Sequence, residues 1–187
     1  MIKRTIDIVV SLAGFFGLAI PLVVIAVVVK LTSRGPVLYW SERVGRGNRI
    51  FRMPKFRSMR VDTPVVATHL LESPDKWLTP IGSFLRKSSL DELPQLWSIL
   101  NGDMSIVGPR PALHNQQDLI EMRTQRGVHV LRPGLTGWAQ INGRDEIPLA
   151  DKVAYDTWYL QHRSLWLDLR IMVLTAVKVL RKEGVAH

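Results

Sequence analysis

The feature that most constrains what this chain can fold into is the stretch of residues 8–29, which contains no charged side chain. A helix needs about 20 apolar residues to cross the hydrocarbon core of a bilayer, and this stretch is long enough. Lys3 and Arg4 precede it, while Lys30 and Arg34 follow it. Since basic residues are favoured on the cytoplasmic side of a membrane, both flanks carry the signal for the same side.

Pro21 lies within this apolar stretch and removes one helical hydrogen bond, so we expect a kink there. Two half-helices could enter the bilayer, turn near Pro21 and leave by the same face. The basic flanks favour this re-entrant form only slightly over a straight spanning helix. A cleaved signal peptide is the third alternative, but no small-x-small cleavage site follows Val29.

The charge balance indicates an anionic partner, because 25 Lys and Arg residues outweigh 16 Asp and Glu residues to give a net charge of +9. Phosphorylated substrates, acidic membrane surfaces and nucleic acids all fit this charge. The aromatic residues do not alternate with basic ones as a stacking platform requires, so we expect no nucleic-acid partner. Cysteine is absent, which excludes disulfides, thiolate nucleophiles and zinc–thiolate sites.

The pattern beyond the apolar stretch predicts a mainly α chain with a short β-hairpin, an α+β fold. Strands are expected at 37–40 and 50–56, joined by a turn at 45–48. Helices are expected at 90–100, 113–125, 150–161 and 164–182, with Asn101-Gly102 as a helix stop. Residues 60–80 read as a surface loop, and residues 131–143 as a tight loop rich in Gly and Pro.

The expected helix at 164–182 is apolar with one polar strip. At 100° per residue, Asp168, Thr175, Lys178 and Lys182 fall within that strip. Packing in the protein core and insertion into the headgroup region of a membrane explain this helix equally well.

The most informative motif is the acidic pair Asp91-Glu92 within residues 89–94. The dipole at a helix start favours ionised carboxylates, and an ionised carboxylate can bind Mg²⁺ or act as a covalent nucleophile. The alternative is that Ser89 and Glu92 form an S-x-x-E capping box and do nothing else. Proline prefers the first helical position, so the helix could also begin at Pro94, with the acidic pair in the preceding turn.

Basic residues could complement this acidic pair. Arginine binds phosphate as a two-pronged fork, so several arginines together could hold a diphosphate. A solvated surface charge is the alternative for any single one. Gly108-Pro109-Arg110-Pro111 is different because it fixes the backbone rigidly around one guanidinium, and residues 131–138 have the same character, with two glycines that permit close backbone approach.

Four ordered motifs resemble one known family, the monotopic phosphoglycosyl transferases, also called bacterial sugar transferases. They are KFRSM at 55–59, SLDELPQL at 89–96, GDMSIVGPRP at 102–111 and RPGLTGWAQINGR at 132–144. The resemblance, which runs to about residue 182, also includes Tyr155-Asp156 and Leu167-Asp168-Leu169.

The resemblance implies an enzyme that transfers a sugar 1-phosphate from a UDP-sugar to a polyprenyl phosphate and releases UMP. It implies that Asp91 attacks the diphosphate and carries a covalent phosphosugar, that Mg²⁺ is required, and that Asp91 and Glu92 hold the metal. It also implies a re-entrant helix within residues 1–34, a cytosolic catalytic domain with interfacial helices over 35–187, and the cytoplasmic face of a bacterial inner membrane. The chain is expected to be a minimal-core member.

The expected substrate-binding residues lie in or near the matched motifs. They are Lys55, Arg86, Arg110, Arg132, Thr136, Gln140, Asn142, Arg144, Asp156 and Asp168. For Asp156 and Asp168, a structural ion pair is an equally good reading.

One departure and several alternatives stay open. Members of the family commonly carry Ser-Pro at the helix break, whereas this chain carries Ile20-Pro21. A basic, membrane-associated scaffold without enzymatic activity is the alternative function, although it does not explain the rigid loops around arginines. Membrane lipids are expected partners in either case. The sequence does not name the sugar, the glycoconjugate pathway or the oligomeric state, for which a homodimer is one alternative.

Overall fold

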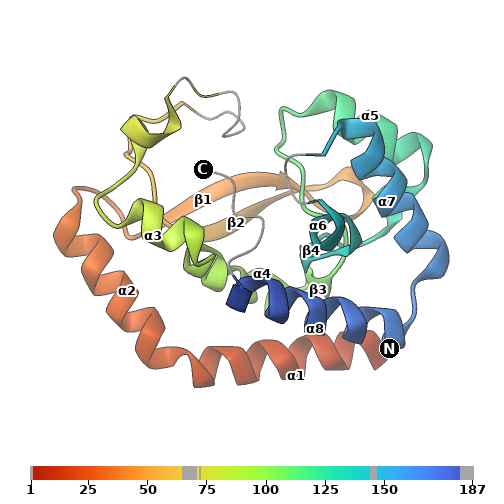
Figure 1. Ribbon diagram of the computed structural model, residues 1–187, viewed down its shortest axis with the longest axis horizontal. Coiled ribbons are helices and arrows are strands. Elements are labelled where there is room, and N and C mark those ends of the chain that lie inside the picture. The colour runs from red at the N-terminus through yellow and green to blue at the C-terminus, as the bar shows by residue number, and fades with distance from the viewer. Residues whose placement is uncertain (1, 65–70, 72, 144–146, 182–187) are drawn as a thin grey trace.

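The computed structural model describes residues 2–64, 71, 73–143 and 147–181, and it is mainly helical with one antiparallel hairpin (Figure 1). The predicted α+β class is therefore confirmed. In chain order the elements are α1 (Ile2–Gly17), α2 (Ala19–Thr32), β1 (Leu38–Val44), η1 (Arg46–Asn48), β2 (Ile50–Phe56), η3 (Pro74–Trp77), α3 (Gly82–Lys87), η4 (Leu90–Gln95), α4 (Leu96–Asn101), β3 (Ser105–Val107), α5 (Gln117–Gln125), η5 (Val128–Val130), β4 (Gly134–Thr136), α6 (Trp138–Asn142), α7 (Leu149–His162) and α8 (Leu165–Arg181).

The β1–β2 hairpin confirms the predicted strand pair, although the first strand runs further, to Val44. Its antiparallel register runs from Leu38 opposite Phe56 to Val44 opposite Ile50. Gly47 and Asn48 supply the positive φ angles of the turn, at 66° and 59°. The hairpin places Lys55 near the end of β2, beside the acidic pair.

A second, parallel pair of strands has one member, β4, in a region that the sequence predicts as a loop. β3 pairs with β4, with Ser105 opposite Gly134 and Val107 opposite Thr136. A three-residue strand that begins with glycine shows too little alternation to be recognised, so the prediction of a tight loop over 131–143 is wrong for β4 and α6.

The N-terminal apolar stretch forms two helices bent by 63°, but the break lies at Leu18 and not at Pro21. Pro21 sits in the first turn of α2, where its missing N–H leaves the carbonyl of Gly17 without a helical donor and its ring would clash with that carbonyl. The helix must therefore break before the proline. By length and composition, no single described helix could cross a membrane; only the bent pair α1–α2 taken together could.

Helix α1 turns several polar residues towards the protein and leaves five of its apolar side chains exposed, while Val10 and Phe15 pack against the main buried cluster. Asp7 and Ser11 are buried, and the Asp7 carboxylate accepts hydrogen bonds from the Ser105 hydroxyl and the Ile106 backbone N–H, both at 3.0 Å. Arg4 donates to the carbonyls of Ile99 and Leu100 in the last turn of α4, where helical carbonyls lack some of their usual backbone donors. The exposed apolar residues of α1 are Ile2, Ile6, Val9, Leu12 and Phe16.

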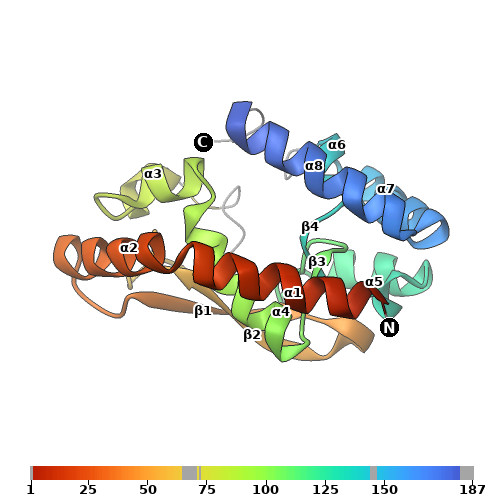
Figure 2. The same cartoon turned by 90° about the horizontal axis from the view of Figure 1, so that it is seen from below.

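Helix α8 also turns polar residues towards the protein, together with the buried Leu167 and Ile171, and it lies along the same side of the molecule as α1 (Figures 1 and 2). The hydroxyls of Thr175 and Thr136 are 2.6 Å apart, and Lys178 donates to the carbonyl of Ile141 at 2.6 Å. The predicted polar strip therefore packs inwards; Lys182 lies outside the described residues. The exposed apolar residues of α8 are Leu165, Trp166, Leu169, Val173, Val177 and Val179.

Two buried clusters hold the segment that carries the acidic pair. Ile99, Met104 and Ile171 are wholly buried where α4, β3 and α8 meet. Phe56 and Leu85 join α2 and α3 to the hairpin in the second cluster. The helix predicted over 90–100 is a 3₁₀ turn, η4, followed by α4, and it stops at Gly102 with φ 96°, as predicted.

Candidate active site

Asp91 and Glu92 lie in η4, which packs against β2. The preceding residue, Ser89, adopts a left-handed conformation with φ 56° and makes no side-chain capping hydrogen bond. The capping-box alternative is therefore wrong. The acidic pair is built into a short 3₁₀ turn ahead of α4, which points the two carboxylates towards the basic residues of neighbouring segments.

The Glu92 carboxylate is held by two cations. Its Oε1 atom accepts from Lys55 Nζ at 2.7 Å and from Arg110 Nη2 at 3.1 Å. Burial by itself would raise the pKa of Glu92, but the charges and hydrogen bonds of Arg110 and Lys55 hold it well below its usual range. Glu92 is therefore a fixed anion that orients two basic side chains.

Asp91 has a different environment although it is the adjacent residue. It is 6% exposed, and its nearest cationic partner is Lys55, with Nζ 4.0 Å from Oδ2. Within the described chain no hydrogen bond reaches its carboxylate. Burial raises the pKa of Asp91 above its usual value, the charge of Glu92 adds to this, and Lys55, Arg86 and Arg110 oppose it. Burial therefore works against the effect of a helix start, which favours the ionised form of Asp91.

Three of the predicted phosphate-binding cations gather around this pair. Lys55 and Arg110 contact Glu92 directly, and the charge of Arg86 acts on Asp91. Arg86 is half-buried, with Nη1 3.8 Å from the sulfur of Met59. The cluster of Lys55, Arg86 and Arg110 around Asp91 is hereafter called the cationic cluster.

The glycines of the two rigid loops, residues 108–111 and 131–138, allow the loops to pack closely against each other. Gly108 donates to the carbonyl of Thr136 and Gly134 donates to that of Pro109, both at 2.9 Å. A Cβ atom on Gly134 would collide with the backbone of Gly108, and one on Gly137 would collide with the Gly108 carbonyl. The close backbone approach expected from sequence is thus between the loops, and it fixes the backbone that presents Arg110.

Arg123 is a site-positioning residue that sequence reasoning missed. Its guanidinium donates twice to one oxygen of Asp156, at 2.9 and 2.6 Å, and its Nη1 donates to the backbone carbonyl of Arg110 at 2.8 Å. Both side chains of the pair are buried. Arg123 lies four residues after the apolar Leu119 on the predicted helix, and this spacing was the available signal that it faces the interior.

Asp156 and Asp168, both predicted to bind substrate, make buried contacts within the protein. Burial raises the pKa of Asp156, and Arg123 opposes that rise. Asp168 accepts from Lys3 Nζ and from the Tyr159 hydroxyl, each at 2.6 Å. The alternative reading of both residues as structural ion pairs accounts for these contacts.

Within the described residues, the remaining predicted ones make no side-chain hydrogen bond or ion pair with the acidic pair. Gln140 donates to the Leu135 carbonyl, with its own Oε1 buried and unpartnered, and Asn142 donates to the Trp138 carbonyl. Thr136 contacts Thr175, as described above. Arg132 is half-buried, and no side-chain bond restrains it within the described residues, whereas Arg144 lies outside them.

The acidic pair has the donor chemistry for a magnesium ion bound together with substrate. The described residues contain no group of three or more His, Asp or Glu side chains that could hold a metal by themselves. Mg²⁺, however, is commonly held by one or two carboxylates and the phosphates of a substrate. Asp91 and the second oxygen of Glu92 are available for that mode.

Comparison with known proteins places the chain in a family. The sequence profile described as bacterial sugar transferase matches residues 1–182, so the chain belongs to the bacterial sugar transferase family. A UDP-glucose:undecaprenyl-phosphate glucose-1-phosphate transferase of Xanthomonas campestris pv. campestris is 48% identical over 95% of this chain and 38% of its own length.

Two further relatives carry related names. A protein of Escherichia coli strain K12 with the same name as the Xanthomonas relative is 42% identical over 95% of this chain and 40% of its own length. The UDP-galactose-lipid carrier transferase of Erwinia amylovora is 36% identical over 98% of this chain and 41% of its own length. The chain therefore spans about two-fifths of the length of these relatives.

Proposed function

We propose that this protein transfers a sugar 1-phosphate from a UDP-sugar to a polyprenyl phosphate, with undecaprenyl phosphate as the acceptor named for its relatives. The observation that carries the proposal is the contrast at the acidic pair. One oxygen of Glu92 accepts from both Lys55 and Arg110, while Asp91, buried beside it, accepts no hydrogen bond within the described residues and faces the cationic cluster. Such a carboxylate is available for bond formation at a phosphate that the cations bind.

The reaction we propose has two displacement steps. In the first, an oxygen of the Asp91 carboxylate attacks the sugar-linked phosphorus of the UDP-sugar, the bond from that phosphorus to the bridging oxygen breaks, and UMP leaves with the electron pair. In the second, a phosphate oxygen of the polyprenyl phosphate attacks the same phosphorus, and the bond to Asp91 breaks. The products are a polyprenyl diphosphate sugar and the original carboxylate.

The cationic cluster would bind the phosphate oxygens in both steps. The guanidinium of Arg110 is aimed by Glu92 on one side, and its backbone is held by Arg123 on the other. Lys55 lies between the two carboxylates. Its ammonium can therefore stabilise negative charge both on Asp91 and on the leaving phosphate as that charge shifts during the reaction. Mg²⁺, which we propose as the cofactor at Asp91 and Glu92, would neutralise phosphate charge that otherwise repels a carboxylate nucleophile.

We also propose that α1 and α2 enter one leaflet of a bacterial inner membrane and return, leaving the catalytic part on the cytoplasmic face. The support is the contact of Lys3 with Asp168 and with the Val107 carbonyl. A straight spanning helix would separate Lys3 from these residues by a bilayer. The outward-facing apolar residues of α1 and α8 would then lie among lipids.

The topology can be tested with single cysteines, because the chain has none of its own. Ile2→Cys reports on the start of α1 and Arg49→Cys on the hairpin turn, and both side chains are exposed. In intact spheroplasts both cysteines should resist a membrane-impermeant thiol reagent and should react after lysis. Labelling of position 2 in intact cells, with position 49 protected, would show a spanning helix.

The chemistry is tested by incubating the membrane-reconstituted protein with a panel of UDP-sugars. We expect UMP release with at least one sugar and, before lipid acceptor is added, a phosphosugar mass adduct on Asp91. Asp118→Asn, an exposed carboxylate at the start of α5, is the matched control for Asp91→Asn. An adduct on another residue would overturn the role of Asp91, and absence of UMP release from every UDP-sugar would favour the scaffold alternative.

A further inference from the structure

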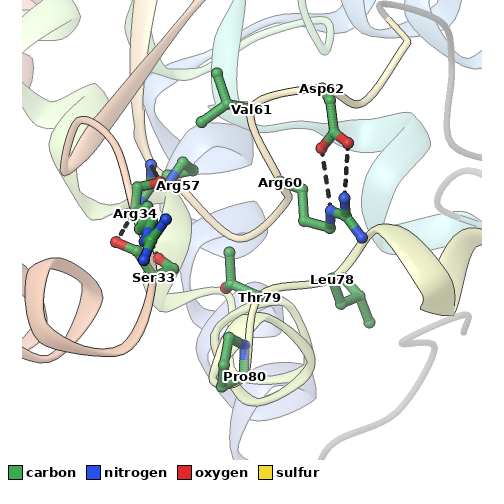
Figure 3. A pocket seen from close by; sticks show the side chains of 9 residues that line it. All are labelled: Ser33, Arg34, Arg57, Arg60, Val61, Asp62, Leu78, Thr79 and Pro80. Atoms are coloured by element: carbon green, nitrogen blue, oxygen red, sulfur yellow. Dashed lines mark hydrogen bonds and ion pairs between the residues drawn. The ribbon is translucent and has the colours of Figure 1, made fainter.

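A pocket of about 510 Å³ lies where α2 ends, outside the residues assigned to the reaction above. Its walls come from the end of α2, from the segment after β2 and from the segment before α3 (Figure 3). In Figure 3, Arg34 and Arg57 stand on one side of the pocket and the Arg60–Asp62 pair on the other. The remaining lining residues are Ser33, Val61, Leu78, Thr79 and Pro80.

Arg57 gives this pocket a buried positive charge that no carboxylate among the described residues contacts. The residue is 4% exposed, and its guanidinium donates to the carbonyls of Ser33 and Arg34 and to the Ser33 hydroxyl. These acceptors are neutral, and the Nε atom has no hydrogen-bond partner. Since a buried charge is costly unless it is paired, an anion in the pocket would complete the environment of Arg57.

Two further arginines strengthen the attraction for an anion. Within the described residues no hydrogen bond or ion pair restrains the exposed Arg34 side chain, so it is available to a ligand. Arg60 is paired with Asp62 through contacts of 3.0 and 2.7 Å, which offsets one charge. With three arginines and one aspartate, the lining keeps a net positive charge.

Apolar side chains form part of the remaining pocket wall and continue beyond it. Val61, Leu78 and Pro80 line it, and the exposed side chains of α2 continue from it down to the bend of the helix pair. Leu31, one turn from the pocket, is 80% exposed. A ligand that matches both features has an anionic phosphate head and a hydrocarbon chain that can follow α2.

Strand β2 and its continuation connect the pocket to the acidic pair. Lys55 and Arg57 are two residues apart on an extended segment, because the Arg57 N–H continues the ladder of β2 to the Val37 carbonyl. Side chains at this spacing point to the same face and lie about 7 Å apart at their Cα atoms. A phosphate bound at Arg57 would thus lie one step along the same face from the lysine that contacts Asp91 and Glu92.

We propose that this pocket receives the phosphomonoester head of the polyprenyl phosphate acceptor, with Arg34 and Arg57 as its phosphate ligands. The inference rests on the proposed function and extends it by giving the second substrate a binding site distinct from that of the UDP-sugar. A phospholipid headgroup and free phosphate share part of this chemistry, so the test must separate the three sources.

Direct binding of farnesyl phosphate to the full chain in phosphatidylcholine nanodiscs tests the site without requiring turnover. Arg34→Gln removes an unrestrained charge, and Leu78→Trp fills the pocket without changing its charge. We expect each variant to raise the dissociation constant at least tenfold. Arg49→Gln, which removes an exposed arginine at the opposite end of the hairpin, should leave it unchanged. Unchanged binding in both pocket variants would overturn the proposal.

Competition separates the sources of phosphate. Farnesol, which lacks the phosphate, should compete at least tenfold more weakly than farnesyl phosphate, and so should phosphatidylglycerol and inorganic phosphate. Equal competition by phosphatidylglycerol would show a general phospholipid site. Equal competition by inorganic phosphate would show a free-anion site. Either result would overturn the acceptor assignment.

Turnover then separates this inference from the proposed function. In Arg34→Gln, release of UMP from UDP-sugar before acceptor is added should match that of wild type, while the KM for the lipid acceptor should rise at least tenfold. A protein that releases no UMP from any UDP-sugar but binds farnesyl phosphate through Arg34 would refute the reaction and retain the lipid site. A loss of the UMP step in Arg34→Gln would place Arg34 with the nucleotide and overturn the acceptor assignment.

Discussion

Asp91 and Asp156 are both buried carboxylates, but their surroundings are opposite in kind. At Asp156, Arg123 donates two hydrogen bonds to the carboxylate, and the pair is sealed between α5 and α7. At Asp91, the nearest ammonium is 4.0 Å away and no hydrogen bond is made within the described residues. Both carboxyl groups have a raised pKa because of burial, yet only one has a partner that satisfies it.

This difference separates a carboxylate that holds the fold from one that is available for chemistry. A buried charge with a complete set of partners is fixed, and removing one partner is costly. A buried carboxylate without hydrogen bonds is a local destabilisation that the rest of the fold must support, which is typical of functional sites. Removal of each carboxylate should therefore change stability in opposite directions.

The largest expected effect is on activity in Asp91→Asn, which should fall by several orders of magnitude while the protein remains folded. Its melting temperature at pH 7.5 should rise. Burial raises the pKa of Asp91, so the folded state favours the protonated form of this carboxyl group. The stability that the protonated form gives to the folded state is lost as the pH rises above the usual aspartate value of about 3.9. Asparagine stays neutral and avoids this loss. UMP release and thermal unfolding measure the two effects. A variant that melts lower than wild type would show that the Asp91 charge is satisfied.

Next in size is the loss of stability in Asp156→Ala, which leaves the Arg123 guanidinium buried without its carboxylate. We expect the free energy of unfolding to fall by about 3–5 kcal/mol, measured by urea denaturation. The double variant Arg123→Met/Asp156→Leu should recover much of this loss because it removes both charges. If Asp156→Ala instead kept wild-type stability and lost only activity, Asp156 would belong with the substrate, as the sequence suggested.

A smaller effect is expected in Arg110→Lys, which keeps the charge but loses the planar fork. We predict at least a tenfold loss in kcat/KM for the UDP-sugar, equivalent to about 1.4 kcal/mol of transition-state stabilisation. Arg126→Lys, an exposed change just after α5, is the matched control and should be neutral. Near-normal kcat/KM in Arg110→Lys would reduce the loop to a structural role.

The smallest expected effect is a pH-dependent one in Glu92→Gln. Since Lys55 and Arg110 depress the pKa of Glu92 against the effect of burial, its ionised form stabilises the folded state. The stability difference between wild type and variant should be complete above about pH 5 and should shrink as the pH falls below about 4, the usual glutamate range. Thermal melts across this range measure the difference. A constant gap at all pH values would mean that the Glu92 charge contributes nothing to folding.

The sequence predicted what depends on neighbours along the chain. The hairpin, the stop at Gly102 and the helices at 150–161 and 164–182 follow from turn residues and periodicity, and the structure confirms them. The gathering of Lys55, Arg86 and Arg110 at the acidic pair was also predicted, through motifs of the family. These features are encoded locally or by a recognisable set of residues.

What the sequence did not reveal depends on contacts between distant segments. Asp156 is explained by Arg123, 33 residues away, and Asp168 by Lys3, 165 residues away, and nothing in the local pattern pairs them. The break before Pro21 was misplaced because a proline acts on the carbonyl four residues before it.

The contact between Lys3 and Asp168 also links the order of synthesis to the order of folding. A ribosome makes α1 well before the carboxylate that receives Lys3 and before the strand whose Ile106 N–H bonds to Asp7. Until α8 is complete, the polar face of α1 lacks these partners while its apolar face already favours lipid. Membrane insertion should therefore precede the closing of the catalytic part. Deletion of residues 1–34 would remove the Asp7 carboxylate from the buried Ser105 hydroxyl and the Lys3 ammonium from Asp168, so a membrane-free fragment should be poorly folded.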